Sequence, residues 1–220
     1  MAVTTIAQQV TSIIGDWVPS EYPELYKDAF NTIADMIPPD SELWANDSIN
    51  TSTTALTNSG ENVYKILRVI VNSRASKQVG YNDFLRGEDT SSIYYHSGNY
   101  KNPIYSWSAD GILVWRPVGK TPTIYYWQYA NSTDFDTVSS ADLIGTLNGF
   151  PKEARLAAII KSGINILYTK ISDAVQEEED AELLQMLSAQ MQQLQQWLQA
   201  ELQRINIPDK VIGVDKGNKK

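Results

Sequence analysis

Apolar residues near the start of the chain recur every three or four positions, in two successive stretches. This spacing lines them up along one side of a helix and predicts two helices within residues 3–37. Prolines mark the limits: Pro19 separates the stretches, Pro23 suits a first helical turn, and Pro38 with Pro39 should end the second helix. The two apolar stripes are Ile6, Val10, Ile13, Ile14 and Trp17, then Leu25, Ala29, Ile33 and Met36. The pattern predicts a helical hairpin.

The helical pattern returns after Pro151 and predicts two long helices over residues 150–205. Gly163, inside the first of these helices, indicates a close contact with another helix. The apolar stripe of this first helix is Leu156, Ile159, Ile160, Ile164, Leu167 and Ile171. The last helix repeats apolar residues at near-heptad spacing, at Leu184, Leu187, Met191, Leu194, Leu198, Leu202 and Ile205. Pro208 should end it, which leaves residues 206–220 as a flexible tail.

The middle of the chain favours strands. Residues 66–71 form a short β-branched run typical of a buried strand, although a helical turn would also fit. Four more strand-length runs lie within residues 92–130, with the sequences SIYYHS, IYSWS, GILVWRP and TIYYWQYA. Asp110-Gly111 predicts a hairpin turn between two of them, because glycine accepts the positive φ of a tight turn. Residues 46–61, rich in Ser, Thr and Asn, predict an exposed connection.

These elements together predict an α+β fold that is mainly α. The N-terminal hairpin and the two long C-terminal helices should form a helical bundle, with an inserted antiparallel β-region at about residues 63–130. The length of 220 residues fits one domain, here residues 1–205, followed by the tail.

Charge and cysteine content narrow the function classes. The net charge is −8, and residues 1–64 alone hold one basic and nine acidic residues. Such an acidic stretch repels phosphate and argues against a nucleic-acid grip there, although it would equally serve as a solvated face. The absence of cysteine excludes disulfides, thiolate metal sites and a cysteine nucleophile. The sequence predicts no secretion signal and no membrane span.

Residues suited to catalysis are few. His96 is the only histidine, so multi-histidine metal sites are excluded, and a single histidine among tyrosines is more often structural than catalytic. No phosphate-binding glycine motif is present. Asp110, Asp134 and Asp136 lie near the aromatic strands in sequence, as in a glycosidase cleft, but acids in such loops are usually solvated turn residues. The sequence therefore predicts no enzyme, no catalytic residue, no cofactor and no metal site.

Aromatic residues in the predicted strands leave two readings open. The rings of Trp107, Trp115 and Trp127, with the neighbouring tyrosines, would offer stacking faces to a non-catalytic carbohydrate-binding module. Strands and protein interfaces use the same residues, and bulky side chains on both strand faces suit a sheet packed on two sides or against a neighbour. We interpret these three tryptophans as stiff structural elements and candidates for a subunit interface.

The last helix carries eight glutamines opposite or beside its apolar stripe. Its stripe is expected to pack inside the subunit. Amides pair across identical surfaces without charge repulsion, so the glutamine-rich side favours a contact between copies of the chain. Gln192, Gln195 and Gln199 are the candidate interface residues.

The order of three segments resembles the head-to-tail adaptor, or connector, proteins of tailed bacteriophages. The front WVPSEYPELYKDAFNTIADMIPPD resembles the acidic, proline-bounded helix of that family. The centre NPIYSWSADGILVWRP, followed by TIYYWQYA, resembles its inserted β-region. The back FPKEARLAAIIKSGINILYTKISD, then EEEDAELLQMLSAQMQQLQQWLQAELQRI, resembles its closing pair of helices.

The resemblance implies a virion structural protein of the neck, made in the cytoplasm of a host bacterium and free of enzyme activity. It implies a homo-oligomeric ring beneath the portal protein that extends the DNA channel, passes DNA without specific binding and supports the next neck or tail protein. Another neck or tail-completion component is the nearest alternative. The tail would reach into the portal, and its candidate docking residues are Val211, Ile212, Val214, Lys216, Lys219 and Lys220.

Overall fold

The computed structural model describes residues 5–15, 23–44, 50–59, 63–87, 101–130, 135, 149–176 and 181–206. The chain forms two compact units. The first, which we call the helical unit, comprises Met1–Leu43 and Ala130–Lys220, and the second, the β unit, comprises Trp44–Tyr129. The fold is α+β and mainly α, as the sequence predicts. The β-region expected at about residues 63–130 lies in the β unit, which begins earlier, at Trp44.

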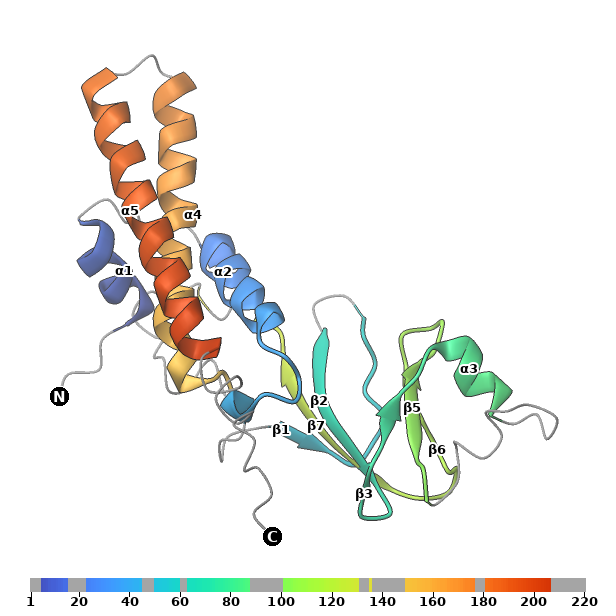
Figure 1. Ribbon diagram of the computed structural model, residues 1–220. Coiled ribbons are helices and arrows are strands. Elements are labelled where there is room, and N and C mark those ends of the chain that lie inside the picture. Colours follow the sequence, from blue (N-terminus) through green and yellow to red (C-terminus); the bar gives the residue numbers. More distant parts are fainter. Residues whose placement is uncertain are drawn as a thin grey trace, which may run out of the picture. The chain divides into compact units, whose positions relative to one another are not determined.

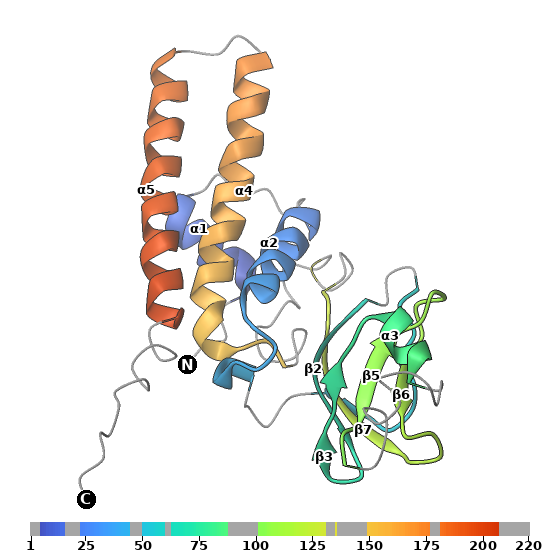
Figure 2. The ribbon, with the colours of Figure 1, turned by 45° about the vertical axis from the view of Figure 1, so that its right-hand side comes forward.

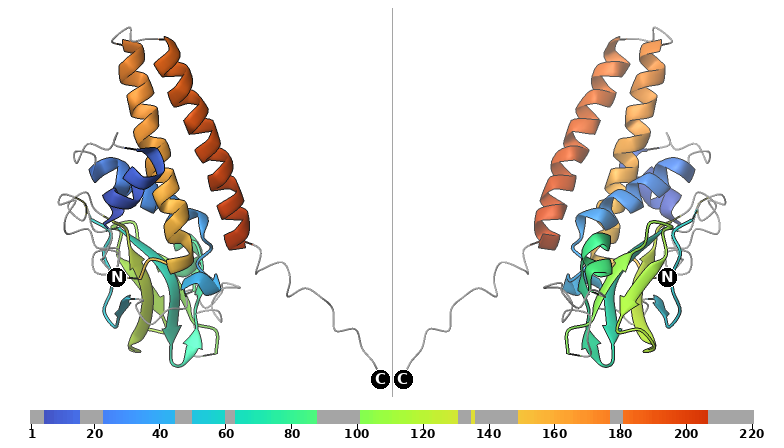
Figure 3. Two further views of the ribbon diagram at one scale, coloured as in Figure 1. Left: turned by 90° about the vertical axis from the view of Figure 1, so that its left-hand side faces the viewer. Right: turned by 90° about the vertical axis from the view of Figure 1, so that its right-hand side faces the viewer.

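Four helices build the helical unit: α1 (Ile6–Ile14), α2 (Pro23–Met36), α4 (Arg155–Gln176) and α5 (Ala181–Asn206). A 3-10 turn, η4 (Lys152–Ala154), leads into α4. The helices α4 and α5 form a long antiparallel pair that extends beyond α1 and α2 (Figure 1), as two further views show (Figure 2; Figure 3). The helices α1, α2 and α5 all pack on α4. The two N-terminal helices therefore make their main helix contacts with α4, and a direct hairpin contact between them is minor.

Local chemistry explains where these helices begin and end. Thr5 caps α1 in a reciprocal capping box: its hydroxyl accepts from the Gln8 amide at 3.2 Å, and the Gln8 side chain accepts from the Thr5 amide at 3.0 Å. The helix α2 begins at Pro23 and ends at Met36, before Pro38 and Pro39, as predicted.

The core of the helical unit differs from the predicted stripes in two places. On α2 the buried side chains include Tyr26, Phe30 and Ala34, while Met36 is 53% exposed and Leu25 is only half-buried. The stripe is rotated because Phe30 packs against Phe135 and Phe150, with ring centroids 5.6 and 5.1 Å away, and these rings fix the helix orientation.

On α4 residues 157–167 are buried around most of the helix circumference, because three helices pack on it. Ala157, Ala158 and Ile166 join the predicted stripe there. Leu156, in the first turn, is 38% exposed and was wrongly assigned to the core.

Tyr26 carries the first testable consequence of this packing. Its hydroxyl is buried and has no hydrogen-bond partner among the described residues, and burial raises the pKa of Tyr26 to about 12. Since an unsatisfied buried hydroxyl destabilises the folded state, Tyr26→Phe should raise the free energy of unfolding by about 1 kcal/mol at neutral pH. Denaturant titration measures this difference; a loss of stability would show that the hydroxyl makes a favourable contact.

The same substitution should change the alkaline limit of stability. An unfolded tyrosine ionises near pH 10, whereas folded Tyr26 stays protonated to about pH 12, so proton release favours unfolding between these values. Stability of the wild type should fall as pH rises through this window, and Tyr26→Phe should lose less. If both proteins lose the same free energy of unfolding between pH 10 and about 12, the raised pKa of Tyr26 is contradicted.

The β unit contains seven strands and one short helix within its described residues. The strands β1 (Asn50–Ser52), β2 (Tyr64–Val71), β3 (Arg74–Ala75) and β7 (Pro122–Gln128) form an antiparallel sheet in the order β1-β7-β2-β3. A second sheet has the order β4-β5-β6, from β4 (Lys77–Gln78), β5 (Ile104–Trp107) and β6 (Leu113–Arg116). The helix α3 (Tyr81–Arg86) follows β4. Side chains from both sheets, including Val69, Leu113 and Ile124, share one core.

Three of the predicted central strands are confirmed as β5, β6 and β7, and residues 66–71 lie in the strand β2. The run SIYYHS lies outside the described residues. The predicted hairpin joins β5 to β6: the Gly111 amide donates to the Ser108 carbonyl at 3.0 Å, and Gly111 has a φ of +71°. A Cβ at this position would lie 2.8 Å from the Asn58 carbonyl oxygen, so only glycine fits.

Two expectations for this unit need correction. Residues 46–61 are not wholly an exposed connection, because they contain β1 and the buried Leu56, whose carbonyl accepts from the Leu113 amide at 2.9 Å. The strand β1 is polar because it is short and lies at a sheet edge, where backbone pairing suffices. In addition, β4 pairs with β5 in parallel, so the β-region is not purely antiparallel.

Candidate interaction surfaces

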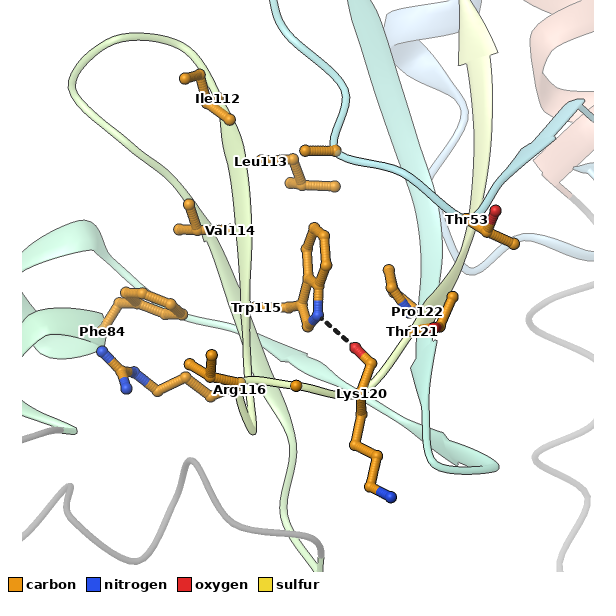
Figure 4. Close-up of a pocket in the computed structure, with 13 residues that line it drawn as sticks. Thr53, Phe84, Ile112, Leu113, Val114, Trp115, Arg116, Lys120, Thr121 and Pro122 are labelled. Atoms are coloured by element: carbon orange, nitrogen blue, oxygen red, sulfur yellow. Dashed lines mark hydrogen bonds between the residues drawn. The ribbon is translucent and has the colours of Figure 1, made fainter.

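An open groove of about 540 Å³ lies in the β unit, along β6 and its connection to β7 (Figure 4). The indole of Trp115 stands in it, and its Nε1 donates to the Lys120 carbonyl at 2.9 Å. This hydrogen bond ties the ring to the loop before β7 and limits its rotation. The Arg116 guanidinium lies 4.7 Å from the centre of the Phe84 ring, a cation–π contact that holds α3 against β6.

The lining of the groove is chiefly apolar. Ile112, Val114 and Val118 contribute alkyl groups, and among the described lining residues Arg116 and Lys120 are the charged ones. Within the described part of the chain, the lining includes no Asp, Glu, Asn, Gln or His. The apolar side chains of this lining would suit an apolar protein surface.

The three predicted tryptophans have different environments. Trp107 and Trp115 are half-buried and pack against the core shared by the two sheets. Trp127 is 1% exposed, and its ring centroid lies 6.1 Å from that of Trp44 and 5.2 Å from that of Tyr129. As a core residue, Trp127 is unsuited to a subunit interface, and this part of the prediction is corrected. Trp44 was missed because no periodic run surrounds it.

The outer side of α5 is the second candidate surface. Gln192, Gln195 and Gln199 are exposed, as an interface role requires. Met186 and Trp197 are exposed as well, by 53% and 42%, and were not predicted. Their signal in the sequence is positional, since both fall outside the near-heptad stripe.

This surface of α5 also lacks charge. Between residues 183 and 200 the helix has no Asp, Glu, Lys or Arg. At 3.6 residues per turn, Met186, Gln193 and Trp197 fall along one side of the exposed surface, while Gln192 and Gln199 fall along the other. An uncharged helix side with a large exposed indole is typical of protein contacts.

The inner side of α5 follows the predicted stripe, with Leu187, Leu194 and Ile205 buried. Below it, Arg204 donates to both carboxylate oxygens of the buried Glu201, at 2.6 and 3.0 Å, and to the Glu153 carbonyl at 3.2 Å. The hydrogen bonds from Arg204 to Glu201 raise the pKa of Arg204 above its ordinary value. These contacts hold the C-terminal end of α5 against η4.

Of the remaining predicted residues, only Asp110 lies within the described part of the chain. Asp110 is exposed in the β5–β6 turn. His96, Asp134 and Asp136 lie outside the described residues. The tail candidates Val211, Ile212, Val214, Lys216, Lys219 and Lys220 lie outside them too.

Within the described ranges, no cluster of three or more His, Cys, Asp or Glu side chains is placed to hold a metal ion. No helix in the described part of the chain has the length and apolar character needed to cross a membrane. No protein family, curated protein or solved structure matches the chain.

Proposed function

We propose that the chain is a virion structural protein, a head-to-tail adaptor whose copies form a ring beneath the portal of a tailed bacteriophage. The ring would extend the DNA channel and offer a platform for the next neck or tail protein. The outer side of α5 carries this proposal. Its exposed amides, together with Met186 and Trp197, give each subunit an uncharged surface suited to a neighbouring copy.

The order of elements supports the same function. A β unit inserted between two N-terminal helices and a closing pair of long helices is the layout that the resemblance to adaptor proteins implies. The long antiparallel pairing of α4 with α5 suits a structural part.

The Trp115 groove is the surface that we assign to the next protein of the neck. Its apolar lining and open shape suit an apolar segment of a partner, and Trp115 is held in place by its hydrogen bond to Lys120. A carbohydrate ligand remains the alternative for this groove. Retention of the protein on a glycan array, lost in Trp115→Ala, would favour that alternative.

Replacing Gln192, Gln195 and Gln199 together with lysine should prevent assembly and leave the monomer folded. Lysine is as good a helix former as glutamine, but three added positive charges per subunit would repel across a contact between copies. Light scattering gives the mass of the assembly, and circular dichroism gives the thermal stability of the monomer.

The matched control is the triple alanine variant at the same positions, which removes the amides without adding charge. It should weaken assembly less than lysine does. High salt should partly restore assembly of the lysine variant, since salt screens the repulsion. An assembly of unchanged mass in the lysine variant would exclude this side of α5 as the interface.

A further inference from the structure

The two units carry charge of opposite sign. The helical unit holds 10 basic and 20 acidic residues, a net charge of −10, whereas the β unit holds 8 basic and 6 acidic residues, a net charge of +2. The contrast is sharper among the described residues of the β unit, where Asp83 and Asp110 are the only acids. All eight basic residues are described: Lys65, Arg68, Arg74, Lys77, Arg86, Lys101, Arg116 and Lys120.

Two of these basic residues, Arg68 and Lys77, are exposed and lie side by side where β2 turns into β3 and β4. The Ser76 amide donates to the Val69 carbonyl at 2.7 Å, which continues the pairing past β3 and brings Lys77 across from Arg68 on the same side of the hairpin. Arg74 is the register partner of the buried Val71 and lies on the opposite side. No ion pair to Arg68 or Lys77 is found among the described residues, and Asp83 instead pairs with Arg86 at 3.7 Å. We call Arg68 and Lys77 the basic face.

The helical unit has an acidic counterpart on α2. Asp28 and Asp35 are exposed and lie seven residues apart, so they share the side of α2 opposite the buried Phe30 and Ile33. Asp40 and Glu42, just beyond the end of the helix, are exposed as well. We call these four residues the acidic face.

We propose that the basic face of one copy docks on the acidic face of the next copy in the ring. A ring with head-to-tail contacts needs two different complementary surfaces on every subunit, and this chain offers one of each sign. The inference rests on the proposed ring and specifies a charged part of its interface. It adds to the uncharged surface of α5, which alone would not set the direction of the contact.

Nucleic acid is the other polyanion that such a basic face would attract. Two cations would neutralise only about two phosphates, which gives weak and salt-dependent binding. The net charge of −10 on the helical unit would also repel the phosphate backbone. A second copy of the chain, with its concentrated acids, is therefore the better partner.

Two charge-reversed variants test the docking. The first carries Arg68→Glu and Lys77→Glu, and the second carries Asp28→Lys and Asp35→Lys. At low salt each variant alone places like charges across the contact, so the protein concentration needed for half-assembly should rise at least about tenfold. Mixed in equal amounts, the two variants should assemble again, because each supplies the surface that the other has lost. Sedimentation velocity measures all three samples.

The outcomes separate the proposals. Assembly of both variants at wild-type concentration would overturn the docking while leaving the ring intact. Assembly that recovers only when both sets of changes are placed in one chain, and not on mixing the two variants, would show that the basic and acidic faces pair within one subunit. That result would also overturn the proposed docking between copies. Binding of a labelled DNA duplex that is lost in the first variant, with assembly unchanged, would assign the basic face to nucleic acid. A wild-type chain that never assembles would remove the proposed function as well.

Discussion

Trp127→Ala should destabilise the β unit by about 3–5 kcal/mol, the usual cost of removing a fully buried aromatic side chain. The ring of Trp127 is 1% exposed and lies between Trp44 and Tyr129, so its loss leaves a cavity lined by two other rings. Lys65 pairs with Trp127 in the sheet register and places its Nζ 5.6 Å from the centre of the Trp44 ring, so the cavity would disturb this contact too. Denaturant unfolding followed by near-ultraviolet circular dichroism measures the change.

Trp115→Ala is the matched control, in the other sheet of the β unit. Its ring is half-buried and partly faces the groove, so it should cost about half as much, roughly 2 kcal/mol. A loss at Trp115 as large as that at Trp127 would contradict the distinction between groove and core. A loss below about 1 kcal/mol would mark the Trp115 ring as a ligand-facing group and strengthen the carbohydrate alternative.

Gly163→Val should destabilise the helical unit by about 2–3 kcal/mol through overpacking. An ideal Cβ on Gly163 would already lie 3.1 Å from Ile14 Cγ2 of α1 and 3.5 Å from Leu194 Cδ1 of α5. Two further methyl groups have no space between these helices, so α1 or α5 would have to move away from α4. Thermal unfolding followed by far-ultraviolet circular dichroism measures the loss of helix.

Gly163→Ala is the control for this prediction and should change stability little. Alanine gains about 1 kcal/mol of helix propensity, and this gain offsets the small shift that Ile14 must make. Combining Gly163→Val with Ile14→Ala should recover part of the loss by making room in α1. If valine alone is tolerated as well as alanine, the close approach of the three helices is contradicted.

Sequence reasoning located the helices well because prolines and apolar periodicity act locally. Pro23, Pro38 and Gly163 all have the roles that their sequence context indicates. The rotation of the α2 stripe was not predictable in this way. Phe135 and Phe150, which fix it, lie more than a hundred residues away in the chain.

For the strands and surfaces too, local signals were predictable from the sequence and long-range contacts were not. The hairpin at Asp110-Gly111 followed from its turn chemistry, whereas β3 and β4, two residues each, are too short to show any alternation. Trp44 and Trp127 became neighbours only through folding. The charge contrast was missed because the count over residues 1–64 joins the acidic N-terminal helices to the first part of the β unit, which begins at Trp44.

The most direct measurement is the mass of the purified wild-type protein by light scattering, alone and mixed with the portal protein that the proposed function implies as its partner. The proposed function requires a closed assembly whose mass is a multiple of 24.6 kDa, alone or on the portal, and its loss in the triple lysine variant at Gln192, Gln195 and Gln199. A protein that stays at 24.6 kDa at every concentration, and that ignores the portal, would contradict the adaptor ring.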